Sequence, residues 1–291
     1  VTAASTSQLT VTIPTGASRD RISLITPGGR AFSEINFLPT YSTSSIFGNG
    51  SFNPAKVSWA TGVTAPYPTG TYARNIATAD FDGDGKLDVA VVNQPSLSTA
   101  NGTVSVFRNV STVGTINASS LSPKQDFVTA PSPWSIYVTD MDGDGKLDVL
   151  VGTNSTTLSV LRNTSSIGAI SFENKVDLTA GNNVWGIKLA DMNGDGASEL
   201  IIANLNSSSL SVYPNTSTSG VISLGTPVTI SGVNSPRFID IGDLDGDNKP
   251  DIAVAQGNGG MGVILNNSTP TTLAFGAPYI GYFSTGQYPW D

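Results

Sequence analysis

The sequence predicts an all-β chain in which one small antiparallel sheet is repeated. Three observations predict it. A nine-residue acidic segment occurs four times, each copy leads into a short apolar run rich in β-branched residues, and the copies begin at residues 80, 140, 191 and 243, at spacings of 60, 51 and 52 residues. A period of this size is typical of repeat folds whose unit is one supersecondary element. The 31 glycines and 17 prolines suit short strands joined by many turns.

The four acidic segments, here named loops 1 to 4, have the pattern of a loop that folds around a hard cation. Each places oxygen-bearing side chains at positions 1, 3, 5 and 9. Ca²⁺ takes about 6–8 oxygen ligands at about 2.3–2.6 Å, and alternate residues of a tight loop can supply them. Position 7 varies in side chain, so we expect only its backbone carbonyl to contribute. The predicted ligands are Asp80, Asp82, Asp84, Lys86 and Asp88 in loop 1; Asp140, Asp142, Asp144, Lys146 and Asp148 in loop 2; Asp191, Asn193, Asp195, Ala197 and Glu199 in loop 3; and Asp243, Asp245, Asp247, Lys249 and Asp251 in loop 4.

Position 6 of the loops is Gly85, Gly145, Gly196 or Asn248, and these residue types suit a backbone with positive φ. Loop 3 carries Asn193 where the others carry a carboxylate, and we expect weaker binding there because ligand charge tunes affinity. The simpler alternative is four acidic surface turns, since Asp and Gly are ordinary turn residues. Four copies with their ligand-type residues in register favour the metal-binding interpretation.

An EF-hand is excluded by the residues on the C-terminal side of each loop. It needs a bidentate Glu at position 12 and a helix on each side. Position 12 is here Val91, Val151, Ile202 or Val254, all apolar. The run Leu87–Val92 has the composition of a short buried strand. Each loop is therefore expected to join two strands.

Each loop holds the same place in a longer unit. Six residues before its first aspartate stands an arginine or a tryptophan, and after it come an apolar strand, a polar turn and another strand. The residues ahead of the loops are Arg74, Trp134, Trp185 and Arg237. The later strands are expected at 104–109, 158–163, 210–215 and 261–266, and a fourth strand near Phe52, Phe127, Phe172 and Phe275. Four short antiparallel strands per unit are the anatomy of a β-propeller blade.

These units resemble FG-GAP or VCBS-type repeats, the blades of integrin-α-like propellers, and Phe275–Pro278 reads Phe-Gly-Ala-Pro. The resemblance covers residues 51–291. It implies four structural calcium ions, bound between the first two strands of each blade, and a ring of seven blades of which four and a fragment lie here. Residues 288–291 align with residues 132–135 ahead of loop 2, so we expect the segment to be part of a longer polypeptide.

Residues 1–42 carry no such loop. Arg21–Thr26 reads as a strand and Pro27–Arg30 as a hairpin-type turn. The segment resembles the end of an immunoglobulin-like TIG/IPT domain; an irregular β-cap on the following domain is the alternative. Residues 43–50, rich in Ser, Gly and polar residues, are expected to be a linker to the blades at 51–291.

The net charge of −8 comes mainly from the loops, which hold 15 of the 22 acidic residues. Four Ca²⁺ ions would neutralise it, so charge says little about partners. The sequence has no basic run to neutralise phosphates, so nucleic acid is not expected as a partner. No segment approaches the roughly 20 apolar residues of a membrane span. Without cysteine, disulfides and thiolate metal sites are excluded, and the first residues lack signal-peptide features.

Two classes of function remain open. The favoured one is a calcium-stabilised binding or structural module of a large secreted or cell-surface protein, expected to be bacterial: an adhesin with a protein or glycan ligand on the extracellular side. The alternative is an accessory or catalytic propeller of a polysaccharide-active enzyme. No catalytic residue is predicted, because the absence of His and Cys removes the commonest bases and nucleophiles. The acidic residues outside the loops are Asp20, Glu34, Asp126, Glu173, Asp177, Asp240 and Asp291.

Two further patterns have a simple interpretation. Trp134, Trp185 and Trp290 have the ring surface to stack on sugars, but their fixed place ahead of a loop favours packing between blades. Asn-x-Ser/Thr triplets, such as those at Asn101 and Asn163, are numerous, and a composition rich in Asn, Ser and Thr accounts for them.

Overall fold

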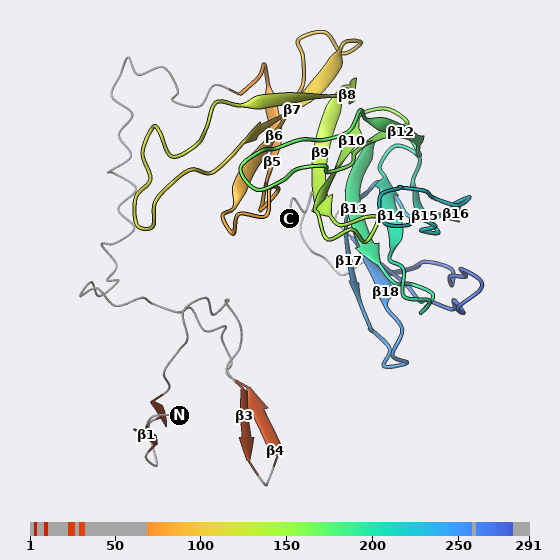
Figure 1. Cartoon of the computed structure of the whole chain (residues 1–291). Helices are drawn as coiled ribbons and strands as arrows, with labels where there is room; N and C mark the ends of the chain where they lie inside the picture. The colour runs from red at the N-terminus through yellow and green to blue at the C-terminus, as the bar shows by residue number, and fades with distance from the viewer. Residues whose placement is uncertain are drawn as a thin grey trace. The chain divides into compact units, whose positions relative to one another are not determined.

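The computed structural model describes residues 69–257 and 260–281, together with four short strands nearer the N-terminus (Figure 1). The chain divides into two compact units, residues 1–63 and 64–291. In the first unit β1 (Ala3–Ala4) pairs with β2 (Leu9–Thr10), and β3 (Ser23–Thr26) pairs with β4 (Gly29–Phe32), both antiparallel. The hairpin predicted at this place is confirmed, although β4 takes in two residues expected in the turn. The TIG/IPT resemblance and the linker at residues 43–50 remain predictions, because most of these residues lie outside the described set.

The second unit contains four antiparallel sheets of four strands, here named blades 1 to 4. In each blade every strand pairs with the next along the chain. Blade 1 contains β5 (Ala73–Ala79), β6 (Asp88–Asn93), β7 (Asn101–Phe107) and β8 (Gln125–Pro131); blade 2 contains β9 (Pro133–Thr139), β10 (Asp148–Thr153), β11 (Thr157–Leu161) and β12 (Val176–Thr179). Blade 3 contains β13 (Val184–Ala190), β14 (Glu199–Asn204), β15 (Ser209–Tyr213) and β16 (Val228–Ser231); blade 4 contains β17 (Pro236–Gly242), β18 (Asp251–Gln256), β19 (Met261–Ile264) and β20 (Tyr279–Gly281).

This architecture confirms the predicted fold class. Every regular element among the described residues is a strand, and each loop joins the first strand of a blade to the second. No helix in this part of the chain is suited to crossing a membrane. The first strands β5, β9, β13 and β17 form one edge of their sheets and contact one another in succession (Figure 1). The four loops therefore follow the ends of neighbouring strands.

The fourth strands begin later than expected in two blades. Phe172 forms an isolated bridge with Asn163, and Phe275 with Asn266, four residues before β12 and β20 begin. A short hairpin thus precedes the fourth strand in these blades, whereas β8 already contains the phenylalanine expected there. Phe52 lies outside the described residues.

Apolar side chains fill the space between successive blades in three clusters. In β10, Val149 and Val151 pack against blade 1, whereas Leu150 packs against blade 3. Side chains of a strand alternate between the two faces of its sheet, so a strand covered on both faces reads as a continuous apolar run. Fully burying one such side chain stabilises the fold by about 1.5–3 kcal/mol. The buried apolar side chains between the blades therefore come mainly from the second and third strands.

A stack of side chains crosses the blades where the first strands begin. The Arg74 guanidinium lies 4.7 Å from the ring centroid of Trp134, whose ring is 5.7 Å from that of Trp185. The Arg237 guanidinium lies over the Trp185 ring, 4.9 Å from its centroid. Such contacts contribute about 0.5–1.5 kcal/mol each. The predicted packing role of both tryptophans is confirmed; Trp290 lies outside the described residues.

Candidate metal sites in the four loops

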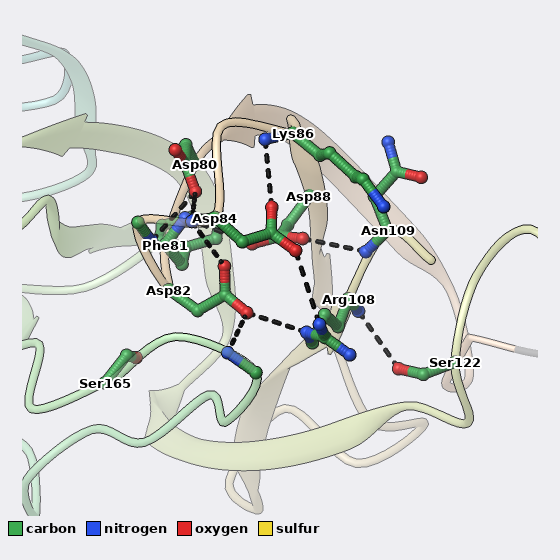
Figure 2. Close-up of polar contacts among 12 residues, drawn as sticks. Asp80, Phe81, Asp82, Asp84, Lys86, Asp88, Arg108, Asn109, Ser122 and Ser165 are labelled. Atoms are coloured by element: carbon green, nitrogen blue, oxygen red, sulfur yellow. Dashed lines mark hydrogen bonds and ion pairs between the residues drawn. The ribbon is translucent and has the colours of Figure 1, made fainter. Parts of the chain in front are cut away.

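The first carboxylate of each loop holds the loop backbone in shape. Asp80 Oδ1 accepts the N–H groups of Gly83 (2.9 Å) and Asp84 (3.1 Å), and its Oδ2 accepts that of Gly85 (2.8 Å) (Figure 2). Gly85 has a φ of 84°, the left-handed region that glycine adopts without steric cost. Asn248, at the same position of loop 4, has a φ of 67°, which confirms the prediction for position 6. The contacts to positions 4 and 6 recur from Asp140, Asp191 and Asp243.

Positions 3 and 5 continue the same arrangement. Asp82 Oδ1 accepts the Asp84 N–H (3.1 Å), and Asp84 Oδ1 accepts the Lys86 N–H (2.9 Å). Short polar side chains commonly accept a hydrogen bond from the backbone two residues on, so these turns are dictated locally. Loops 2 to 4 repeat both bonds. The part expected of the position 7 carbonyls stays a prediction.

The position 9 carboxylate is buried in every loop. Asp148 Oδ2 accepts the N–H of Met141 (2.9 Å), and its Oδ1 accepts that of Asn163 (2.8 Å). Burial raises the pKa of Asp148 to about 6; the two N–H groups oppose this, and the charges of Asp142 and Asp144 add to it. A buried carboxylate beside other carboxylates is costly without a counter-ion. The four residues are Asp88, Asp148, Glu199 and Asp251.

Three of the loops bring carboxylates close enough to share one ion. In loops 1, 2 and 4, oxygens from positions 1, 3 and 9 lie within 4.8 Å of one another. Position 5 is outside these sets, and in loop 3 the amide of Asn193 takes position 3. All the side-chain donors are oxygens, which is what hard divalent cations prefer. The residues of these loops therefore fit a metal ion, and the acidic clusters could hold one.

Arginines outside the nine-residue pattern hold the outer oxygens of two loops. Arg108, just after β7, donates from Nε to Asp82 Oδ2 (2.7 Å) and from Nη2 to Asp84 Oδ2 (3.3 Å) (Figure 2). Arg162, just after β11, makes the matching contacts with positions 3 and 5 of loop 2, at 2.6 and 2.5 Å. Burial would raise the pKa of Asp82, but the hydrogen bond from Arg108 and two backbone N–H groups hold that pKa below its usual value.

An asparagine after the third strand links neighbouring loops. Asn163 is fully buried, and its Nδ2 donates to the Leu147 carbonyl of its own loop (2.9 Å) and to the Phe81 carbonyl of loop 1 (2.9 Å). Its Oδ1 accepts the Ser165 N–H (2.8 Å). The same bond to the preceding loop is made by Asn215 to Met141 (3.1 Å) and by Asn266 to Met192 (2.7 Å). Each of loops 1 to 3 is thus held by its own blade and by the following one.

The hairpin after this asparagine also covers the preceding loop. The Gly168 N–H donates to Asp82 Oδ2 (2.9 Å), and the Gly220 N–H donates to Asp142 Oδ2 (3.0 Å). Asp82 is accordingly 4% exposed and Asp142 5% exposed, whereas Asp245 of loop 4 is exposed. The surroundings of position 3 therefore depend on the next blade.

The arginines and asparagines were not among the predicted site residues, although a signal for the asparagines was present. An Asn ends every expected third strand, at residues 109, 163, 215 and 266, and each begins an Asn-x-Ser triplet. Composition does not account for these four triplets. The asparagine Oδ1 accepts the serine N–H in each of them. The side-chain amide of Asn163, whose nitrogen a glycan would need, is buried between two loops.

None of the described acidic residues outside the loops belongs to the three carboxylate sets. Asp126 bonds Ser105 (2.5 Å) and pairs with Lys124 (2.6 Å), and blade 2 repeats the arrangement at Asp177. Glu173 pairs with Arg162 and Asp240 with Lys188. Asp20, Glu34 and Asp291 lie outside the described residues.

Comparison with protein families agrees with this arrangement. The model described as "FG-GAP repeat" matches residues 72–107, and the one described as "FG-GAP-like repeat" matches residues 140–202 and 191–254. A search of curated proteins gave no significant match. The matched ranges contain all four loops, the first two strands of blades 1 and 3, the second strand of blade 2, and the first strand and most of the second strand of blade 4. The chain is therefore built, over these residues, from FG-GAP and FG-GAP-like repeats.

Proposed function

We propose that loops 1 to 4 bind calcium and that the ions stabilise the blades. The observation that carries the proposal is the set of carboxylates from positions 1, 3 and 9 within 4.8 Å of one another. Two of the three are buried in loops 1 and 2 and one is buried in loop 4, so a bound cation would offset both the desolvation of the buried carboxylates and their repulsion by their neighbours. Ca²⁺ suits a loop with several carboxylates better than Mg²⁺, which keeps most of its water.

Thermal unfolding with and without calcium tests this proposal. A ligand that binds only the folded state at 100 times its Kd adds about 2.7 kcal/mol per site. We expect 2 mM Ca²⁺ to raise the Tm of EGTA-treated protein by at least about 5 °C, since 1 kcal/mol corresponds to about 2–4 °C in a domain of this size. The same concentration of Mg²⁺ is the control. An unchanged Tm with calcium would refute the proposal.

We further propose that the chain is a binding or structural module of a larger secreted or cell-surface protein. FG-GAP repeats are typical of extracellular proteins, and calcium is available there to fill the loops. The role that we propose is that of an adhesin whose blades bind a protein or a glycan, because the four sheets pack on one another and form a scaffold. Binding to an array of glycans and to extracellular matrix proteins, with calcium and with EGTA, tests this role. Calcium-dependent binding would support it; no binding to either class would count against it.

We propose, in addition, that this module is not an enzyme. Each described acidic residue outside the loops is paired with a lysine or an arginine. These ion pairs support a structural role for the four carboxylates. A polysaccharide-cleavage screen measures the alternative directly, and release of reducing or unsaturated ends would overturn the proposal of a non-catalytic module.

A further inference from the structure

The four loops share one backbone arrangement but differ in the positive groups around them. Arg108 faces the carboxylates at positions 3 and 5 of loop 1, and Arg162 faces those of loop 2 and also Glu173. The residues at the matching place after the third strand are Pro214 in blade 3 and Leu265 in blade 4. Neither can supply a positive charge. The loops therefore fall into classes that the nine-residue pattern does not show.

Loop 3 replaces the missing arginine within the loop itself. Its position 3 is Asn193, whose Nδ2 donates to Asp195 Oδ2 (2.9 Å). In loop 1 the equivalent oxygen, Asp84 Oδ2, accepts from Arg108. With an amide in place of a carboxylate at position 3, loop 3 has one negative charge fewer. The same amide donates a hydrogen bond to the position 5 carboxylate. The four ligand side chains and the arginine together carry a charge of −3 in loop 1 and in loop 2. The four ligand side chains of loop 3 carry −3 without an arginine.

Loop 4 has neither an arginine after the third strand nor an amide at position 3. Asp245 and Asp247 are carboxylates like those of loops 1 and 2, but within the described residues neither has a lysine or arginine within 4.0 Å. Both side chains are exposed, and the loop has a charge of −4. Water screens part of the repulsion between these groups, so the expected result is loss of order in this loop and not unfolding of the blade.

We propose that Arg108 and Arg162 are built-in counter-ions that keep loops 1 and 2 in their metal-binding shape when no ion is bound, whereas loop 4 takes this shape only with the ion. The inference rests on the proposed calcium binding. The arginines act through the carboxylates that they hold and are positioning residues. A guanidinium with two fixed N–H donors suits this task, because it fixes the direction of each carboxylate as well as its charge.

Hydrogen–deuterium exchange of the whole chain, in EGTA and in 2 mM Ca²⁺, measures the difference loop by loop. The amides at positions 4 and 6 are the reporters, because each is bonded to the position 1 carboxylate. We expect calcium to slow exchange at Gly246 and Asn248 at least about tenfold, and at the matching amides of loops 1 and 2 less than about threefold. Equal slowing in all loops would overturn the inference and leave calcium binding intact. No slowing in any loop would count against calcium binding itself, and the inference would fall with it.

Variants assign the effect to the arginines. Arg108→Met should make the exchange of loop 1 in EGTA as fast as that of loop 4, while loop 2 keeps its protection; Arg108→Lys should restore part of it. Leu265→Arg places a guanidinium beside loop 4 and should slow its exchange in EGTA; this side chain is 41% exposed, so the fold tolerates the change. The inference is wrong if Arg108→Met leaves loop 1 protected or lowers protection equally throughout blade 1. It is also wrong if Leu265→Arg leaves loop 4 unprotected, because the arginine would then have no specific role.

Discussion

Loop 2 and loop 4 have nearly the same internal hydrogen bonds and different surroundings. In both, the first carboxylate accepts the N–H groups of positions 4 and 6, and the ninth accepts that of position 2. Position 2 is Met141 in loop 2, which is 2% exposed, and Leu244 in loop 4, which is 52% exposed. Asn215 and Gly220 from blade 3 bond to loop 2. No contact of this kind reaches loop 4 from the described residues.

This comparison of loops 2 and 4 shows that the shape of a loop and the stability of that shape have different causes. The residues inside a loop specify which backbone shape it prefers, because Asp, Asn and Gly favour these turns whether or not a neighbour covers them. Neutralisation of loops 1 and 2 comes from an arginine later in the same blade, whereas burial and the links between sites come from the following blade. A loop motif therefore predicts a shape, whereas the stability of that shape also depends on residues of the following blade, which lie up to 86 residues further on.

The largest expected effect is at position 2. Met141→Ala removes a side chain buried between blades 2 and 3, and should lower the free energy of unfolding by about 2–5 kcal/mol. Leu244→Ala is the matched control, and should cost less than about 1 kcal/mol because half of that side chain already meets water. Urea denaturation in excess calcium, followed by tryptophan fluorescence, measures both. Similar costs for the two variants would show that the following blade does not distinguish these loops.

The next effect concerns the asparagine that joins two loops. Asn163→Ala leaves the carbonyls of Phe81 and Leu147 without their donor, and a buried unsatisfied group costs about 1–3 kcal/mol. Asn109→Ala is the control, because among the described residues its Nδ2 donates only to Leu87, within its own blade, and it is half-buried. The same urea titration should place Asn163→Ala at least about 1 kcal/mol below Asn109→Ala. An equal loss would mean that the link to the preceding loop adds nothing.

The sequence predicts the repeated four-stranded unit and the acidic residues inside each loop. It did not predict the arginines and asparagines that hold the loops. The repeat period, the apolar strand after each loop and the positive φ at position 6 are local properties, so a nine-residue pattern and its flanks were enough to predict them. Arg108 lies 24 residues after Asp84, and Asn163 lies 82 residues after Phe81. Their contacts depend on how a blade folds back and how two blades pack, and no pattern inside one loop contains that information. The fourth strands were placed too early for the same reason, because Phe172 and Phe275 serve a hairpin that packs on the neighbouring blade.

The smallest effect tests what the two loops have in common. Position 6 is Gly145 in loop 2 and Asn248 in loop 4, and both have positive φ. No atom lies within 4 Å of a Cβ added at Gly145, so only the backbone conformation opposes a side chain there. Gly145→Ala should cost about 1–2 kcal/mol, whereas Gly145→Asn should cost less than about 1 kcal/mol, because Asn tolerates this region and already occupies it in loop 4. Urea midpoints of the two variants give the order. If Gly145→Asn lowers the free energy of unfolding as much as Gly145→Ala does, loops 2 and 4 do not share one backbone conformation. Their different surroundings alone would then not explain how the two loops differ.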